Sequence, residues 1–578
     1  MGAHDDSWFR PELKSSNNGI GDAYDDDTYY KLVREWTEDV TLQSTGPYMN
    51  WVRNLSESGW IHLRLLTDFM LIGAAPQRWG DLDPKRGPEG LNTYLTSPGE
   101  IERRKEERRR RIAKTKVYML DYHALGNEVK TQIFTSAREL NANLAADITD
   151  GIKFRLYVVE DLSRDVIEAF GQKFKIEPDL FRSHVADFAW SNVLDRSHNP
   201  PLLDIVSRHQ NWMQLRYVTA RYFDTTKAFL DAAKEADNFN ILRRLDDDLS
   251  NKSHWDKKGA IVGLTRSRAT FWLKPTQDDS IPVGILFLDP TVTKGVPLWR
   301  GRRILWPTPT DGQTVPPKPP QDDNLFENFV FWAQQTNLSS SCTPSLPSEA
   351  LLPMQVLLHF VCSEWSTISS YIKTRLNQLN WEVTKPDLFG YGKKGANEML
   401  EKLHMWRRLV PLYREMVSET IQHIDRFSDQ MQQLTTASNS SPSKTDHSLI
   451  DHYRVDLQQI KSQLEEYQSR FDQLTAVVTA VISINNSQRS LQDNRNIGRL
   501  TWLATLFIPL SLIAGILSMQ PSVSDISQGT FKVYFATSLP LGAVIAFATL
   551  ILSWSRSETR TNLKALQRTL QGVWPSKA

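Results

Sequence analysis

Cysteine is scarce in this sequence, and its scarcity excludes two kinds of site. Only two of the 578 residues are cysteines, Cys342 and Cys362, so a disulfide framework cannot hold the fold together. No group of cysteines and histidines has the spacing of a zinc site, and the sequence assigns no metal ligand. So few cysteines fit a reducing, cytosolic setting for most of the chain.

A surplus of one charge is missing as well. The chain has 68 Lys and Arg against 67 Asp and Glu, so no overall charge attracts it to nucleic acid. Residues 101–114, IERRKEERRRRIAK, are locally basic, and binding to nucleic acid or to an anionic lipid is one reading of them. Three glutamates interrupt this run. We therefore interpret it as a solvated helix of mixed charge and expect no nucleic-acid partner.

Catalytic signatures are nearly absent. The sequence contains no Walker A motif, no HExxH and no nucleophile elbow. GYGKKG, residues 390–395, matches G-x-G-x-x-G, but the preceding WEVTKPDLF is not a buried strand and no βαβ unit surrounds the motif. The sequence thus predicts a protein that is not an enzyme and has no cofactor.

The beginning of the chain carries no recognisable targeting signal. MGAHDDSWFR lacks the apolar stretch of a signal peptide and is too acidic for a transit peptide. Asp6 stands where a myristoylation signal needs Ser or Thr. Membrane targeting is therefore expected from segments near the C-terminus, and the plasma membrane is favoured over the mitochondrial inner membrane.

Residues 1–115 are uneven in composition and are predicted to form an N-terminal extension, followed by a cytosolic α/β domain over residues 116–330. A helix-covered sheet is indicated because β-branched and aromatic runs alternate with short amphipathic stretches. The predicted strands are residues 117–122, 154–159, 212–223, 269–274 and 283–289. Residues 306–320 form a proline-rich linker inside this domain. Residues 331–437 then read as a pair of helices, periodic over 351–379 and 396–434.

After a polar hinge, one continuous helix is predicted from Ser448 to Met519. Its first part, residues 448–499, is a coiled-coil stalk with ten consecutive apolar a and d positions. These are Ile450, Tyr453, Leu457, Ile460, Leu464, Tyr467, Phe471, Leu474, Val478 and Val481. Its second part, residues 500–519, contains no charge. At 1.5 Å per residue it is about 30 Å long, which matches the hydrocarbon core of a bilayer.

A second uncharged stretch, residues 533–554, predicts a second transmembrane helix. The outer loop between the two spans, residues 520–532, is short enough to make a membrane hairpin, and a basic tail follows at 555–578. Because Lys and Arg flank the hairpin on its outer ends, both termini are placed in the cytosol. Asp525 is the acidic residue of the outer loop, where it either concentrates cations or is an ordinary solvated side chain.

Polar and small residues of the first span recur on one face at steps of three and four. They include Asn494, Thr501, Thr505, Ser511 and Gly515. In a bundle of helices this face could line an axial pore. Packing against another helix favours the same residue types. Periodicity alone leaves the two interpretations about even.

Residues 494–520, NRNIGRLTWLATLFIPLSLIAGILSMQ, resemble the first transmembrane helix of the CorA magnesium channels. The order of elements also agrees: a cytosolic α/β domain, a helical pair, a long stalk, two spans and a short outer loop. Residues 158–185 further resemble CorA-like proteins of filamentous fungi. The resemblance implies a CorA-like funnel built by a homopentamer in the bilayer, with the stalk and first span around the pore.

By position, the resemblance implies a pore lined by Asn494, Ile497, Leu500, Thr501, Thr505, Ile508, Ser511 and Gly515. The family ends this helix with Gly-Met-Asn at the outer mouth, where it holds a hydrated ion. Here the selectivity motif reads Ser518, Met519 and Gln520, so only the methionine is kept. Serine lacks the backbone freedom of glycine, and glutamine is one methylene longer than asparagine. The altered motif therefore does not identify which divalent ion is transported.

The function implied is transport of a divalent cation such as Mg²⁺ or Zn²⁺ along the axis of a homo-oligomer. Zinc or another divalent ion, with proton coupling as in the zinc-transporting branch of the superfamily, is the nearer variant because the outer motif is altered. The alternative is a non-conducting membrane-anchored scaffold or sensor with the same fold.

Overall fold

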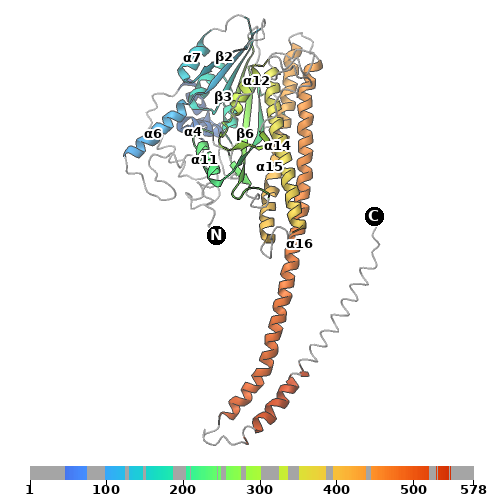
Figure 1. Ribbon diagram of the computed structural model, residues 1–578. Helices are drawn as coiled ribbons and strands as arrows, with labels where there is room; N and C mark the ends of the chain where they lie inside the picture. The colour runs from blue at the N-terminus through green and yellow to red at the C-terminus, as the bar shows by residue number, and fades with distance from the viewer. Residues whose placement is uncertain are drawn as a thin grey trace. The chain divides into compact units, whose positions relative to one another are not determined.

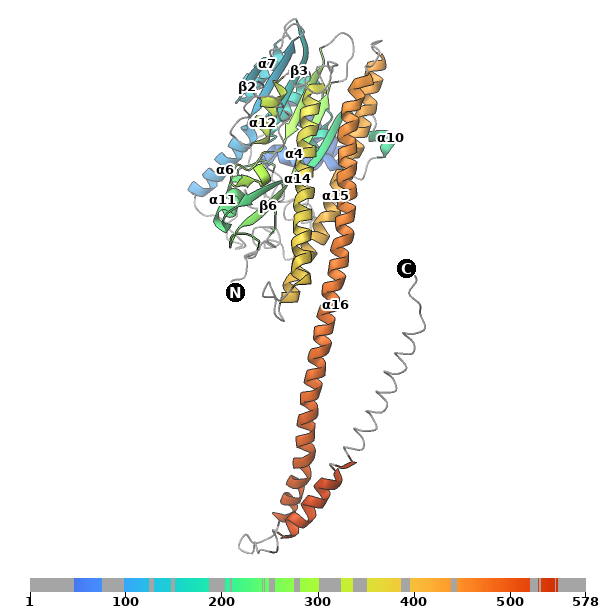
Figure 2. The same ribbon diagram turned by 45° about the vertical axis from the view of Figure 1, so that its right-hand side comes forward.

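The computed structural model (Figures 1 and 2) divides into two compact units, Met1–Thr475 and Ala476–Ala578, which we describe separately. It describes residues 46–74, 98–123, 129–146, 151–186, 203–207, 210–241, 243, 245–248, 255–274, 281–300, 324–335, 351–385, 395–437, 444–519, 529, 532–545 and 547–548. The predicted linker at 306–320 and the basic tail at 555–578 lie outside these residues.

The first unit is built on a mixed eight-stranded sheet in the order β2-β1-β3-β7-β6-β4-β8, with β5 paired to β6. The strands are β1 Val117–His123, β2 Val129–Phe134, β3 Ile152–Glu160, β4 Trp212–Phe223, β5 Leu245–Asp248, β6 Ile261–Leu273, β7 Val283–Leu288 and β8 Val296–Pro297. The pair β3 and β7 is parallel, and the other pairs are antiparallel. All five predicted strands are confirmed, as β1, β3, β4, β6 and β7.

Two features of the sheet differ from what the sequence pattern predicted. Strand β6 begins at Ile261, eight residues before the predicted start. The prediction began too late because Arg266 and Arg268 interrupt the apolar pattern of the sequence, although both side chains are buried in the structure. Strand β2, VKTQIF, was not predicted, since four of its six side chains are exposed and no apolar face marks it. A strand at the edge of a sheet can be polar on both faces, so composition does not reveal it.

Helices cover one face of the sheet. They are α3 Pro47–Glu57, α4 Arg64–Ile72, α6 Pro98–Ala113, α7 Ala137–Ala145, α8 Arg164–Phe174 and α9 Pro178–Val185, with η2 Ile61–Leu63 between α3 and α4. Helices α3 and α4 come from the residues assigned above to an N-terminal extension. They share one hydrophobic core with β3 and β7, in which Phe69, Tyr157 and Phe287 are at most 1 % exposed. Glu168 of α8 accepts hydrogen bonds from the first backbone N–H groups of α3, which completes its N-terminus.

Other short helices occur between and after the strands, and long helices follow them. The smaller ones are α10 Asp204–Ser207, α11 Thr226–Ala236, η5 Leu298–Arg300 and α12 Leu325–Ala333. The long ones are α14 Leu351–Thr384, α15 Gly395–Ala437 and α16 Lys444–Leu517. Helices α14 and α15 occupy the residues predicted as a helical pair, and α16 runs without a break across residue 499.

Helices α14 and α15 close the open edge of strand β4 (Figures 1 and 2). At Arg216 the backbone N–H donates to Oγ1 of Thr420, at 3.1 Å, and the carbonyl accepts from Nε1 of Trp365, at 2.9 Å. Side chains of two helices thus take the place of a neighbouring strand. This satisfies backbone groups that would otherwise be buried without a partner.

The predicted seam of α16 packs on its own chain over the stretch that ends at Phe471, and Val478 further along is also buried. Leu457, Leu464 and Phe471 are fully buried, and the Phe471 ring stacks on Trp406 of α15. On the other side, Ser369 of α14 donates to Gln463 of α16. A coiled-coil seam can pack on a second copy of the chain or on other helices of the same chain. Over this stretch α14 and α15 cover it, so this part of the seam requires no second chain.

Candidate functional site

The candidate pore residues all lie in the last part of α16, within the second unit. Residues 494–517 are helical, and Ser518 and Met519 form a turn directly after the helix. Thr505 is part of this helix, but its side chain is not described. Gln520 of the predicted outer mouth and Asp525 of the predicted outer loop lie outside the described residues.

The other candidate side chains are exposed in the single chain. Asn494, Thr501, Ser511 and Gly515 are exposed, and the exposed fractions of Ile497, Leu500 and Ile508 are 60 %, 69 % and 66 %. Exposure of Asn, Thr and Ser is ordinary, but large apolar side chains that gather on one exposed surface, such as Ile497, Leu500 and Ile508, mark a surface that lipid or protein covers. The structure brings these residues onto a common helix and leaves their face open.

A second helical segment, residues 532–545 and 547–548, lies beside the end of α16 in both views (Figures 1 and 2). Among the described side chains between 500 and 519, Leu510 and Ile513 are half-buried and the others are exposed. In the second segment Ser538 is only 1 % exposed, and Gly542 one turn later is half-buried. Small residues four apart let two helices approach closely.

The half-buried side and the polar side of α16 are opposite each other. Successive helical residues turn by about 100°, which places Leu510 and Ile513 on average nearly half a turn away from Thr501, Ile508 and Gly515. Packing within the hairpin therefore uses a different face from the one that carries the polar residues. This packing face was not predicted, although Ser538 and Gly542 are a pair of small residues four apart that the sequence shows.

Hydrogen bonding inside α16 fixes the chemistry that Thr501 presents. Its hydroxyl donates to the carbonyl of Ile497, at 2.8 Å, which uses its only proton. The hydroxyl oxygen can then act only as a hydrogen-bond acceptor. At Gly515 an added Cβ would meet nothing within 4 Å in the single chain. Packing inside one chain therefore does not require glycine there.

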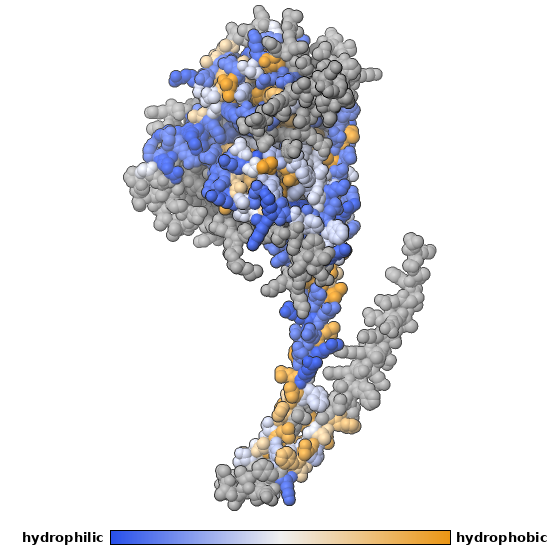
Figure 3. Space-filling model, viewed as in Figure 1, coloured by the Kyte–Doolittle hydropathy of each residue, from blue (hydrophilic) through white to orange (hydrophobic). Residues whose placement is uncertain are grey.

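The surface of the second unit changes along α16 from mainly hydrophilic to mainly hydrophobic (Figure 3). Leu500, Trp502, Leu503, Phe507, Leu512 and Ile516 are between 51 % and 69 % exposed. Among the helices that the structure describes, none meets both the length and the apolarity required for a membrane span.

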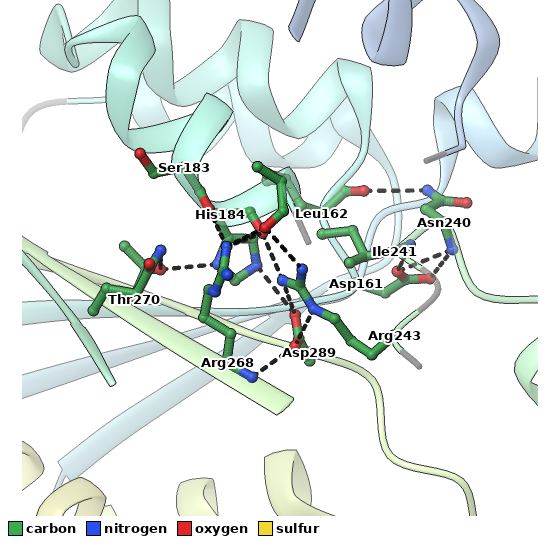
Figure 4. A network of polar contacts seen from close by, with 12 residues as sticks. Asp161, Leu162, Ser183, His184, Asn240, Ile241, Arg243, Arg268, Thr270 and Asp289 are labelled. Atoms are coloured by element: carbon green, nitrogen blue, oxygen red, sulfur yellow. Dashed lines mark hydrogen bonds and ion pairs between the residues drawn. The ribbon is translucent and has the colours of Figure 1, made fainter. Parts of the chain in front are cut away.

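A buried polar network in the first unit is the other place where chemistry could be sought (Figure 4). His184 is fully buried, with Nδ1 2.9 Å from Oγ1 of Thr270 and Nε2 3.5 Å from Oδ1 of Asp289. Arg243 donates to both carboxylate oxygens of Asp289, at 2.7 and 3.1 Å. Burial, together with Arg243 and Arg268, lowers the pKa of His184 well below its usual value. The ring is therefore neutral.

The contacts of Arg243 and Arg268 give this buried network a structural role. Arg243 and Arg268 donate to the backbone carbonyls of Ser183, His184 and Ala186, at the C-terminal end of α9. Cations are favoured at this end of a helix, where the carbonyls lack partners. In the described part of the chain, no group of three or more His, Cys, Asp and Glu side chains could hold a metal. The network fastens α9 to the sheet.

Comparison with known proteins addresses the stretch that carries the exposed face. Residues 344–554 match the family described as CorA-like Mg²⁺ transporter protein. This region is CorA-like. The match includes α14, α15, all of α16 and the second helical segment, and it confirms the resemblance noted in residues 494–520. The sheet lies before the matched residues.

Two further comparisons complete this one. The complete structure of the CorA magnesium transporter from Methanocaldococcus jannaschii aligns with 10 % identity and a TM-score of 0.31, over 75 % of this chain and 96 % of that one. A search of curated proteins found no match.

Proposed function

We propose that this protein is a membrane channel or transporter for divalent metal cations, in which several copies surround a central path lined by α16. The observation that carries the proposal is the exposed face with Asn494, Thr501, Ser511 and Gly515, which lies opposite the face used by the hairpin. Packing within one chain leaves that face without a role. An axial path gives it one.

The side chains on this face suit a hydrated cation. Amide and hydroxyl oxygens of Asn494, Thr501 and Ser511 can accept from, or coordinate through, the water molecules that surround a divalent ion. Ile497, Leu500 and Ile508 alternate with them and would form apolar constrictions, which oppose passage when the path is dry. Rings of polar and apolar side chains in sequence can thus both pause an ion and close the path.

The assembly we propose is a homopentamer in a bilayer, following the family resemblance. The exposed apolar residues of α16 after Arg499 would face lipid or neighbouring copies. Residues 500–519 and 533–554 would be the two spans, with both termini in the cytosol, because Lys and Arg lie on the outer ends of the hairpin. Zn²⁺ and Mg²⁺ are both candidate ions, since Ser518 and Gln520 replace the family's Gly and Asn.

Cation flux into liposomes that hold the purified, assembled protein tests this proposal. Wild type should pass Mg²⁺, Zn²⁺ or Ni²⁺ above the level of empty liposomes. Gly515→Leu should reduce that flux at least tenfold, because one bulky apolar side chain from each copy would then project into the proposed path. Ala514→Leu is the matched control, since the same bulk on the neighbouring, exposed position lies off that face and should leave most of the flux.

Two outcomes would overturn the proposal. The first is an assembled wild type that passes no ion above empty liposomes, which favours the alternative of a membrane-anchored scaffold or sensor. The second is equal loss of flux in both leucine variants, because the polar face would then have no special part in conduction.

A further inference from the structure

Two arginines and a tryptophan lie on one side of α16 where the uncharged stretch begins. Arg495, Arg499 and Trp502 follow one another at steps of four and three residues, which places them on one helix face. All three are exposed, and Trp502 is 51 % exposed. Arg499 is the last charged residue before residues 500–519.

This face is the one turned away from the proposed ion path. Ile513 follows Arg495 by eighteen residues, which is about five complete turns of the helix, so the two lie on one line along it. Ile513 belongs to the half-buried side of α16, opposite Thr501 and Ile508. The two guanidinium groups therefore do not face the path, where they would repel cations.

We propose that Arg495, Arg499 and Trp502 form a binding site for the phosphate of an anionic phospholipid in the cytosolic leaflet. The inference rests on the proposed function, because it takes residues 500–519 as a membrane span. Guanidinium groups one helical turn apart can donate several hydrogen bonds to one phosphate group. Tryptophan is enriched at the same depth, where its indole bridges head groups and acyl chains.

Charge complementarity favours a lipid surface as the partner. The cytosolic leaflet carries negative head groups, and basic side chains next to a span are attracted to it. Trp502 adds an apolar contact that a free phosphate ion in water does not use. A lipid at this position would also contact the side of α16 on which the second helical segment lies, and so would support the hairpin from the cytosolic side.

Native mass spectrometry of the purified full-length protein, titrated with phosphatidylserine or with phosphatidylcholine, tests the site. Wild type should retain phosphatidylserine in preference to phosphatidylcholine. Each of Arg495→Gln and Arg499→Gln should weaken phosphatidylserine binding about fivefold, and the double variant about 25-fold. Trp502→Leu should weaken both lipids while keeping the preference for phosphatidylserine.

Arg489→Gln is the matched control. Arg489 is also an exposed arginine of α16. It lies about 9 Å further from the uncharged stretch than Arg495 does, and about a third of a helical turn away from the face that carries Arg495, Arg499 and Trp502. Binding in this variant should stay within twofold of wild type. Equal weakening by Arg489→Gln and Arg495→Gln, or equal retention of the two lipids by wild type, would overturn the proposal.

Soluble competitors separate a lipid site from a general anion site. Inorganic phosphate and glycerophosphoserine at millimolar concentration should not displace phosphatidylserine from wild type. Displacement by either would overturn the lipid assignment. Lipid binding is measured independently of transport. If the protein passes no ions but still binds phosphatidylserine as described, the conduction proposal is wrong and the lipid-site proposal still holds.

Discussion

The indole ring of Trp406 in α15 lies nearly parallel to the phenyl ring of Phe471 in α16, with ring centroids 6.1 Å apart and planes 11° apart. Both side chains are completely buried. Trp406 also meets the ring of Tyr371 in α14 edge-on, at 5.9 Å. One aromatic cluster therefore joins the three long helices at this level, within a single chain.

Truncation of Phe471 should destabilise the first unit strongly. Phe471→Ala removes a buried ring and leaves a cavity, for which we expect a loss of about 3–5 kcal/mol in the free energy of unfolding. Phe471→Asp should be worse, since it buries a charge without a partner. Val455→Ala on the same helix is the control: Val455 is 54 % exposed, so the change should stay within about 0.5 kcal/mol. Denaturant unfolding of the full-length protein measures both.

Acidification should destabilise the sheet domain through His184. Its pKa is lowered in the folded protein, so the stability that the neutral ring contributes is complete above its unfolded pKa of about 6.5 and is lost as the pH falls below that value. Between pH 7.5 and 5.5 the loss should be about 1 kcal/mol. The His184→Gln variant has no imidazole to protonate at this position. Its free energy of unfolding should therefore fall by about 1 kcal/mol less than that of wild type over the same pH step. Identical pH dependence of the two proteins would contradict the assignment.

Topology can be tested with single cysteines in a background in which Cys342 and Cys362 are replaced by alanine. A membrane-impermeant thiol reagent added to intact cells should label Ser524→Cys, in the predicted outer loop, and should not label Ser576→Cys, in the predicted cytosolic tail. Permeabilised cells are the control and should allow labelling of both. The reverse pattern in intact cells would overturn the proposed orientation.

The predicted outer mouth should set the choice of ion. If Gln520 of each copy occupies the place of the family's asparagine, the ring presents amide oxygens without charge and holds an ion through its water shell. The double variant Ser518→Gly and Gln520→Asn should raise the ratio of Mg²⁺ to Zn²⁺ flux in liposomes, because it restores backbone freedom and side-chain length. Gln520→Ala should change that ratio while the assembled protein keeps its thermal stability. If the ratio of Mg²⁺ to Zn²⁺ flux is unchanged in both variants, residues 518–520 do not determine which ion passes.

Local periodicity located five strands of the sheet and the long helices of this protein. Strands such as Trp212–Phe223 are rich in β-branched and aromatic residues, and the uninterrupted helix through Phe471 and Thr501 follows from apolar spacing with no turn signal. The resemblance in residues 494–520 also rested on spacing within one helix. Such signals are local, since they depend on residues that are neighbours along the chain.

Contacts between distant segments were decided only by the tertiary structure. The part of the stripe from Ile450 to Phe471 could have met a second copy, but α14 and α15 of the same chain cover it. Tyr48, in the stretch assigned to an N-terminal extension, donates to the carbonyl of Ile176 in the core of the sheet domain. The apolar face of a helix specifies that it must be covered, but not by which surface, because burial is non-directional. The polar face around Thr501 was readable from the sequence, whereas only the packing of the hairpin on the opposite side, around Leu510 and Ile513, left that face free.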